Sequence, residues 1–307
     1  QEQYNRVFNY LEEENLEPVV FTNGQLDESV EEFLIQSGAS MQSSGFGYRR
    51  YAQLSYGEAL QDMIKNETHW DRSFTGFRFP FTSPNHWGLM VLDKNQALYE
   101  SSISANNLTF FHGAVVPYNL VLSNGQFFTT TNIMEVAPVY HDDFHFYQDI
   151  LDENHSHPFA TQKATKLYED YLLNYWELAV KPYQGAMVYL GHPAYLGKSD
   201  TTFQPLESLI SRVREEHTWM TTIDEIARFR RDLSQLRFFV EREDRLYTLR
   251  VEGPVDVKVE GLCINVPFEL EKVTSRIGSV KVQTEGGSTQ VVFTGVGGQV
   301  LKLWEGD

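Results

Sequence analysis

The sequence predicts an α/β protein in two parts, a (β/α) barrel over residues 1–235 and a small antiparallel β-sandwich over residues 236–307. A length of 307 residues suits about two domains. Before residue 236, apolar strand-like runs alternate with helical patterns, which is typical of a parallel sheet covered by helices. After it, short β-rich runs follow one another and nine of the 21 glycines occur, which is typical of a sandwich.

The helices of the first part are predicted from apolar spacing and from residues that begin a helix. Tyr4, Val7 and Leu11 lie on one helical face. Ser55, with Glu58 three residues later, forms a capping box at the start of another helix. Helices are therefore expected over residues 4–15, 27–37, 55–65, 161–180, 202–216 and 222–232.

Short apolar runs bounded by turn residues predict the strands between these helices. They cover residues 17–22, 76–79, 185–190 and 218–221. Alternation of this kind implies parallel pairing, and about seven or eight such units would close the sheet into a barrel. Residues 102–150 interrupt the alternation with polar, aromatic and Thr-rich segments, so we expect an inserted hairpin or long loop at one end of the barrel.

The second part has seven strand candidates with turn signals between them, and several alternate cleanly, as in Val255, Val257 and Val259. Its Cys263 lies in an apolar run and is expected to be buried. As the only cysteine, it excludes an internal disulfide framework and a Cys-x-x-Cys zinc site. The strands are expected over residues 237–241, 246–251, 255–259, 262–268, 279–283, 290–294 and 299–304.

Charge and composition exclude several classes of function. The formal net charge of −17 would repel nucleic acid, and most of it belongs to the first part. No run of about 18 apolar residues exists, so no membrane-spanning helix is expected. Aromatic residues make up 14% of the chain, which suits a large aromatic core and also sugar binding. Gln1 with no leader before it indicates a processed protein or a fragment.

Two groups of histidines have the composition of metal ligands. His141, Asp143 and His145 lie within five residues, and the two histidines would share one face if the segment were helical. The alternative is a solvated acidic loop, because an extended run precedes the group. His155 and His157 alternate in a polar segment, which indicates either a chelating pair or a flexible loop.

Two further residues are placed by the strands that they follow. His192 comes directly after the apolar run 185–190, where ligands of parallel α/β proteins bind at the carboxyl ends of strands. Arg78 lies among apolar residues at 76–81 and therefore needs either a carboxylate partner in the core or a ligand.

These residues resemble those of a known family, the polysaccharide deacetylases of the NodB-homology type, which are carbohydrate esterases. The run Gly-Phe-Arg-Phe-Pro-Phe at 76–81 looks like the motif whose Arg orients the catalytic base. Leu-Gly-His-Pro at 190–193 looks like the motif whose His is the general acid. Residues 97–102 and 218–227 are similar to the strand and the closing segment that belong with these motifs. The resemblance covers residues 1–232 and implies a deformed (β/α) barrel, a divalent metal, usually zinc, and a polysaccharide substrate.

The chain departs from this family at the metal-binding motif. The run Phe-Gly-Tyr-Arg-Arg-Tyr at 46–51 looks like His-Gly-Tyr-x-His-Tyr, but Phe46 and Arg50 occupy the two histidine positions. A phenyl ring cannot bind a metal, and a guanidinium is a fixed cation that repels one. The motif that supplies the two Asp residues would precede Tyr4. The resemblance with these departures therefore implies a protein without a resident metal.

Three hypotheses follow from the sequence. In the first, the protein has lost metal-dependent catalysis and binds carbohydrate, with Arg78 and His192 in the former catalytic site. Its sugar-binding surface would then consist of Tyr48, Tyr51, Trp87 and Tyr195.

In the second, the protein is an active deacetylase that holds zinc through other ligands such as His141, Asp143 and His145. In the third, it is a structural or assembly module of a surface protein. Resemblance to a family that modifies glycans suggests an extracellular or cell-surface location. The sequence specifies neither the polysaccharide nor the oligomeric state.

Overall fold

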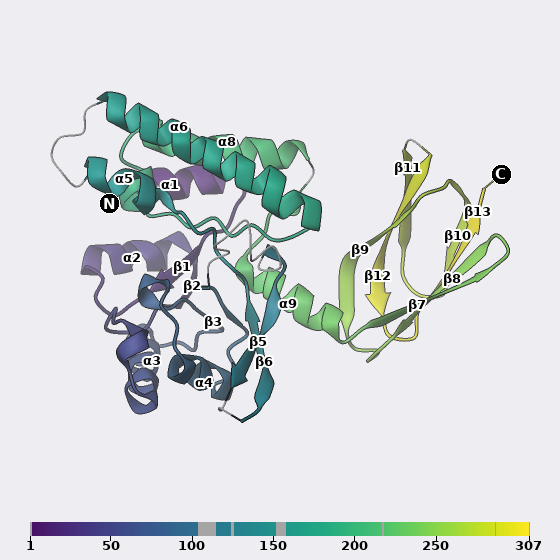
Figure 1. Ribbon diagram of the computed structural model, residues 1–307, viewed down its shortest axis with the longest axis horizontal. Coiled ribbons are helices and arrows are strands. Elements are labelled where there is room, and N and C mark those ends of the chain that lie inside the picture. Colours follow the sequence, from purple (N-terminus) through teal and green to yellow (C-terminus); the bar gives the residue numbers. More distant parts are fainter. Residues whose placement is uncertain are drawn as a thin grey trace. The chain divides into compact units, whose positions relative to one another are not determined.

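The computed structural model describes residues 2–103, 115–123, 126–151, 158–216, 218–285 and 287–306 (Figure 1). The chain forms two compact units, residues 1–227 and residues 228–307. The histidines at positions 155 and 157 lie outside the described residues. None of the helices in the described part of the chain is long and apolar enough to cross a membrane.

A six-stranded sheet forms the centre of the first unit, with the strand order β1-β2-β3-β4-β6-β5. Neighbouring strands run parallel except β5 and β6, which form an antiparallel hairpin. This hairpin confirms the insertion expected within residues 102–150. The strands are β1 (Val19–Thr22), β2 (Ser40–Ser43), β3 (Gly76–Phe77), β4 (Tyr99–Glu100), β5 (Tyr118–Ser123) and β6 (Phe128–Glu135).

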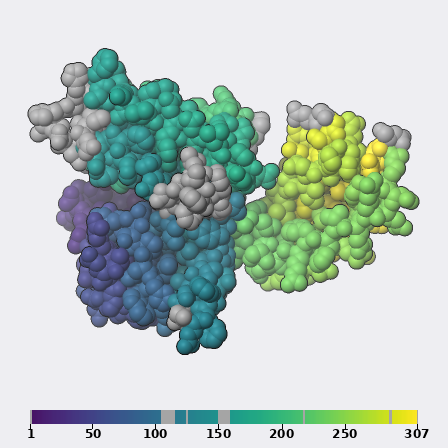
Figure 2. Space-filling model, in the orientation of Figure 1, coloured from purple at the N-terminus to yellow at the C-terminus, as the bar shows by residue number. Residues whose placement is uncertain are grey.

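Helices cover this sheet, and those predicted from the sequence all form. In Figure 1, α5, α6 and α8 make one layer, while α3 and α4 pack together elsewhere against the sheet. Figure 2 shows the same elements as a space-filling surface, with blue segments below the large teal group of the first unit. The helices of the chain are α1 (Glu2–Glu13), α2 (Glu28–Ser37), α3 (Tyr56–Trp70), α4 (His86–Lys94), α5 (Asp143–Leu151), α6 (Pro158–Tyr175), α7 (Pro193–Leu196), α8 (Asp200–Glu215) and α9 (Ile223–Ser234).

Local chemistry explains where several helices begin and end. Ser55 and Glu58 form the predicted capping box at the start of α3. Gly38 ends α2 with a φ of 69°, a left-handed conformation that suits glycine. Aromatic and aliphatic side chains then fill the space between sheet and helices, with Tyr51, Phe77 and Phe79 in one cluster and Tyr168 and Leu172 in another.

Two predicted strands of the first unit are wrong. Residues 185–190 form no strand, and only Val188 pairs, in a parallel bridge with Pro138. A proline has no N–H to extend such a ladder, which explains why the pairing stops there. Residues 218–221 also form no strand, and Thr222 instead caps α9 by accepting a hydrogen bond from the N–H of Glu225 (3.3 Å). The described strands are therefore an open, deformed form of the (β/α) barrel.

The second unit consists of two antiparallel sheets with orders β10-β13-β8-β7 and β11-β12-β9. A core that includes Leu249, Val251, Phe293 and Leu301 fills the sandwich. The strands are β7 (Arg237–Glu243), β8 (Leu246–Glu252), β9 (Lys258–Val266), β10 (Leu270–Ser275), β11 (Val280–Glu285), β12 (Ser288–Val296) and β13 (Val300–Glu305).

The number of strands in the second unit matches the prediction, but the residues that each strand covers do not all match. The runs 255–259 and 262–268 mostly form one strand, β9, because Gly261 makes a β-bulge instead of a turn. It has a φ of 72°, and the register with β12 shifts between Phe293 and Gly295. The polar strand β10 was not predicted. Cys263 of β9 is exposed, so the expectation of a buried thiol is wrong.

Candidate functional site

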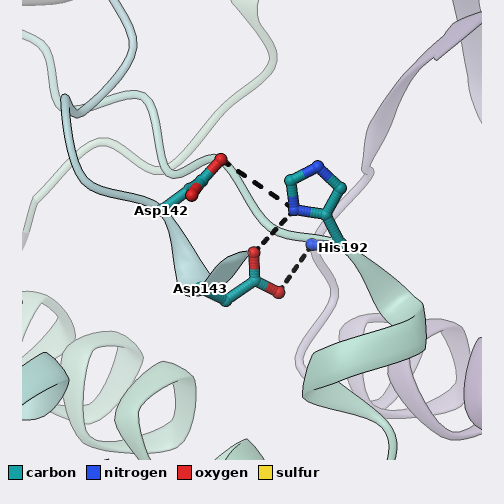
Figure 3. Close-up of side chains that lie close together, drawn as sticks. All are labelled: Asp142, Asp143 and His192. Atoms are coloured by element: carbon teal, nitrogen blue, oxygen red, sulfur yellow. Dashed lines mark hydrogen bonds and ion pairs between the residues drawn. The ribbon is translucent and has the colours of Figure 1, made fainter. Parts of the chain in front are cut away.

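The candidate site is built around an ion pair between Asp143 and His192. Asp143 is the first residue of α5, and His192 is the N-cap of α7. Oδ1 of Asp143 lies 2.7 Å from Nδ1 of His192, and Oδ2 of Asp143 accepts the backbone N–H of His192 at 2.8 Å (Figure 3). Asp143 is fully buried, whereas the His192 side chain is 43% exposed. The carboxylate thus fixes both the backbone and the ring of His192 and leaves Nε2 as the ring nitrogen not held by Asp143.

Asp142 supplies a second carboxylate beside this pair. Its Oδ2 lies 4.0 Å from Nδ1 of His192, and its Oδ1 accepts the backbone N–H of His145 (3.1 Å) in the first turn of α5. One ligand atom from each of Asp142, Asp143 and His192 lies within 4.8 Å of the others. Figure 3 shows both carboxylates directed toward the imidazole.

These carboxylates control the charge of His192. Burial alone would lower the pKa of His192, but the hydrogen bond that Nδ1 of His192 donates to Asp143 and the charges of Asp143 and Asp142 outweigh it and raise that pKa above its ordinary value. The imidazolium form is therefore favoured at the site. A histidine held in this way can donate a proton to a bound molecule through Nε2.

Arg78 lies on the same edge of the sheet, directly after β3. Its Nε and Nη2 donate hydrogen bonds to the carbonyl and the hydroxyl of Ser101, at 2.6 and 2.7 Å. Its guanidinium also covers the ring of Phe21 at 4.3 Å. Burial lowers the pKa of Arg78 to about 10, although the charges of Glu100, Glu135 and Asp142 oppose this shift. Arg78 thus acts electrostatically on Asp142 and, through repulsion, on the imidazolium of His192.

Two buried carboxyl groups, which the sequence analysis did not identify, balance the charge of Arg78. Glu100 and Glu135 are register partners at the ends of the parallel strands β4 and β6, and neither is exposed. Burial raises the pKa of both, and for Glu135 the charge of Glu100 raises it further. Two buried carboxylates cannot both ionise cheaply, so one shared proton and the cation of Arg78 leave the cluster neutral. The only feature of the sequence that could have identified these two glutamates is that each directly follows apolar residues at the end of a strand.

Phe46 and Arg50, which the sequence analysis aligned with metal-binding histidines, do not fit a metal ion. The ring of Phe46 packs edge-on against His69, with 5.8 Å between centroids, and Gly24 leaves room for it. The guanidinium of Arg50 covers the ring of Phe81 at 4.9 Å. Neither side chain offers a donor atom with a free electron pair.

Asp142, Asp143 and His192 are a better set of ligand types for zinc, but their hydrogen bonds oppose it. Both oxygens of Asp143 already accept N–H groups of His192, and Nδ1 of His192 is the donor of one of them. An ion held by both Asp143 and Nδ1 of His192 would have to break the hydrogen bond that positions the imidazole. The residues therefore fit a hydrogen-bonded acid–base pair rather than a zinc centre.

The predicted sugar-binding residues have different surroundings. Tyr48 is 45% exposed, and its ring packs on that of Phe81. Burial raises the pKa of Tyr48, and the charge of Asp142 raises it further, so Tyr48 lies close to the site. Tyr195 contacts the ring of His192 edge-on, with centroids 6.1 Å apart. Trp87 is exposed on α4, where its ring contacts His86.

Tyr51 cannot line a binding surface, because it is fully buried. Its hydroxyl donates to Asp62 (2.8 Å), whose carboxylate also accepts the backbone N–H groups of Phe46 and Gly47. Tyr51 is therefore a core residue that supports the loop after β2. Nothing in the sequence indicated that Tyr51 is buried, because Tyr48 in the same loop is an exposed tyrosine.

The proposed ligand set of His141, Asp143 and His145 is divided by the structure. Asp143 is directed to His192, whereas the rings of His141 and His145 contact each other with centroids 4.4 Å apart. The structure therefore pairs Asp143 with another histidine than the two that the sequence analysis grouped with it. That partner, His192, is 49 residues away.

Comparison with known proteins shows the fold. No protein-family model matches the chain, and no curated protein matches it in sequence. Among solved structures, a candidate polysaccharide deacetylase from Mycobacterium smegmatis matches with a TM-score of 0.59 and 18% identity, over 79% of this chain and 81% of its own. A candidate polysaccharide deacetylase from Pseudomonas aeruginosa PAO1 has a TM-score of 0.53 and 15% identity over 74% and 71%. The Puue allantoinase has a TM-score of 0.50 and 14% identity over 74% and 71%. The first unit thus has the deformed barrel of the polysaccharide deacetylases.

Proposed function

We propose that this protein is a polysaccharide deacetylase-like protein of glycan metabolism that binds carbohydrate and has lost metal-dependent catalysis. One observation carries the proposal. The Asp143–His192 pair is fully formed at the edge of the sheet, while Phe46 and Arg50 contact other aromatic rings instead of forming a metal site. Such a site keeps the groups that recognise a substrate and lacks those that activate water.

The chemistry around His192 suits a sugar ring. Sugars present C–H faces that pack on aromatic rings and hydroxyl groups that exchange hydrogen bonds. Tyr48 and Phe144 are exposed aromatic side chains near the pair, and Phe144 contacts both His192 and Tyr195. The imidazole Nε2 can donate to a hydroxyl or acetyl oxygen, and the carboxylate of Asp142 can accept from a hydroxyl. Binding then needs no metal ion.

A second function, hydrolysis with non-standard metal ligands, is favoured by the proximity of Asp142, Asp143 and His192. In that case His192 would serve as a ligand, and it would lose its proton and its hydrogen bond to Asp143. Acetate release that requires added zinc and is abolished by chelation would support this second function and contradict the first.

Titration with N-acetylglucosamine oligomers in the presence of EDTA tests the binding proposal. We expect saturable binding by calorimetry, with affinity reduced about tenfold or more in Tyr48→Ala, since tenfold corresponds to about 1.4 kcal/mol. Tyr183→Ala is a matched control, because Tyr183 is similarly exposed in the turn after α6. Absence of binding to a panel of acetylated and free oligosaccharides would overturn the proposal.

We also propose an extracellular or cell-surface location, since polysaccharides occur there. Fractionation of the producing cells, followed by immunodetection, tests this part separately. Recovery of the protein only from the cytoplasm would contradict it.

A further inference from the structure

His141 and His145 form a close pair of imidazoles that has no part in the site proposed above. His141 lies two residues before the start of α5, and His145 lies in the first turn of that helix. Their ring centroids are 4.4 Å apart, with an angle of 62° between the planes. The two residues between them that carry carboxylates, Asp142 and Asp143, point toward His192. The histidine pair is therefore a separate feature of this segment.

The electron pairs of these imidazoles are available. Nδ1 of His141 is buried and has no hydrogen-bond partner among the described residues, which is a costly state for a polar atom. Burial, followed by the proximity of His145, lowers the pKa of His141. His145 is exposed, so its ring is free to turn toward a shared ligand. Neutral imidazoles are the form that binds metal ions.

The surroundings add a nearby negative charge and aromatic rings. Oδ1 of Asp142 is fixed beside the first turn of α5 by the N–H of His145, and its charge acts on His141. The rings of Tyr140 and Tyr171 contact His141, with centroids at 4.4 and 5.4 Å. Asp142 offsets the repulsion between a cation and the positive end of the helix dipole.

We propose that His141 and His145 together bind a transition-metal ion such as Zn²⁺, Cu²⁺ or Ni²⁺. Imidazole nitrogens suit these ions. An ion bonds to a ring nitrogen at about 2.0–2.1 Å, so two imidazoles on one ion have centroids no more than roughly 6 Å apart. The observed pair meets this limit without movement of the backbone. This ion would lie apart from the positions of Phe46 and Arg50, where the related enzymes hold theirs.

Zinc titration of the EDTA-treated protein, followed by calorimetry, tests the proposal. We expect one ion per chain, with affinity reduced about tenfold or more in His145→Ala and in His141→Ala, as for the loss of a ligand worth about 1.4 kcal/mol or more. His145 is exposed, so its variant should fold, and circular dichroism checks this. His86→Ala is the matched control, because His86 is a half-buried histidine that also begins a helix.

A spectroscopic measurement identifies the ligands independently. With Cu²⁺ as the probe, electron paramagnetic resonance should show two nitrogen ligands in the parent protein and one in His145→Ala. Absence of zinc binding, or equal affinity in His145→Ala and the parent, overturns the proposal. So does an affinity that falls in His192→Ala but not in His145→Ala, because the ion would then lie on Asp142, Asp143 and His192. Since the carbohydrate titration is done in EDTA, each proposal can fail without the other.

Discussion

At the scale of single residues, Asp143 has the central role in the site because it is buried and both of its oxygens accept hydrogen bonds from His192. A buried carboxylate with two N–H donors is held in one orientation and in turn fixes the imidazole. Asp142, its neighbour in sequence, is less deeply buried, with a side chain that is 17% exposed, and adds a second charge. Two adjacent residues of the same type therefore differ in role because only one faces the core.

The variant Asp143→Asn should lower the pKa of His192. The change keeps the size of the side chain but removes the charge, so burial is no longer outweighed. Since the folded-state pKa is raised, the interaction stabilises the fold below the ordinary value of 6.5 and is lost as pH rises through the raised value. Nuclear magnetic resonance titration of His192 measures the shift. An unchanged pKa of His192 would contradict this, and the exposed Asp170→Asn serves as the control.

The buried pair Glu100 and Glu135 should make the protein less stable as pH rises. Both pKa values are raised, so the unfolded chain releases protons above about pH 4.5 while the folded state retains one. Glu135→Gln removes this penalty, because only one ionisable carboxyl group then remains beside Arg78. Denaturation by urea should show the variant gaining about 1 kcal/mol or more at pH 8 relative to pH 5. Equal losses at both pH values would show that the pair is ordinary packing.

At the scale of helices and strands, the backbone conformation of a glycine decides whether replacing it with alanine stabilises or destabilises the fold. Gly38 ends α2 at a φ of 69°, whereas Gly57 lies in the first turn of α3, and a methyl group at either would meet open space. Any effect of adding that methyl group therefore comes from the backbone alone.

We therefore expect opposite effects from the same change at these two glycines. Gly38→Ala should destabilise the protein by about 1 kcal/mol, the cost of the left-handed conformation. Gly57→Ala should stabilise it by about 0.5–1 kcal/mol through helix propensity and lower entropy of the unfolded chain. Urea denaturation of both variants measures the difference. Effects of the same sign would show that the two backbone conformations are not those described.

The elements that sequence reasoning found are those that local chemistry defines. The capping box at Ser55 and the glycine at position 38 determine where helices start and stop whatever surrounds them. The wrong strand at 185–190 depends on a partner, because its only neighbour supplies a proline. The prediction placed two strands around Gly261 instead of one, because a sequence does not distinguish a glycine at a β-bulge from a glycine at a turn.

The candidate site could be predicted only in part for the same reason. Arg78 and His192 were identified because each follows an apolar run near a strand end. The partner of His192 lies 49 residues earlier, and no local pattern joins it to that histidine. Glu100 and Glu135 become a pair only through the register of β4 and β6. Tyr51 is buried and Tyr48 exposed, although both are tyrosines of the same short loop.

At the scale of the whole molecule, the chain consists of two units with separate hydrophobic cores. The first has a helix-covered parallel sheet whose carboxyl edge carries Arg78, Asp143 and His192, and the second has an antiparallel sandwich. Each core is closed by residues of its own unit, such as Ile133 in the first and Leu301 in the second. Stability is therefore a property of each unit, and the two need not unfold together.

Differential scanning calorimetry of paired core variants tests this independence. Ile133→Ala and Leu301→Ala each remove a fully buried aliphatic side chain, which costs about 2–5 kcal/mol. We expect two transitions in the parent protein, with Ile133→Ala lowering the temperature of one and Leu301→Ala lowering that of the other. Carbohydrate, which the proposal assigns to the first unit, should raise only the transition that Ile133→Ala lowers, because a ligand stabilises the fold that binds it. A single transition moved equally by both variants would show that the two cores unfold as one.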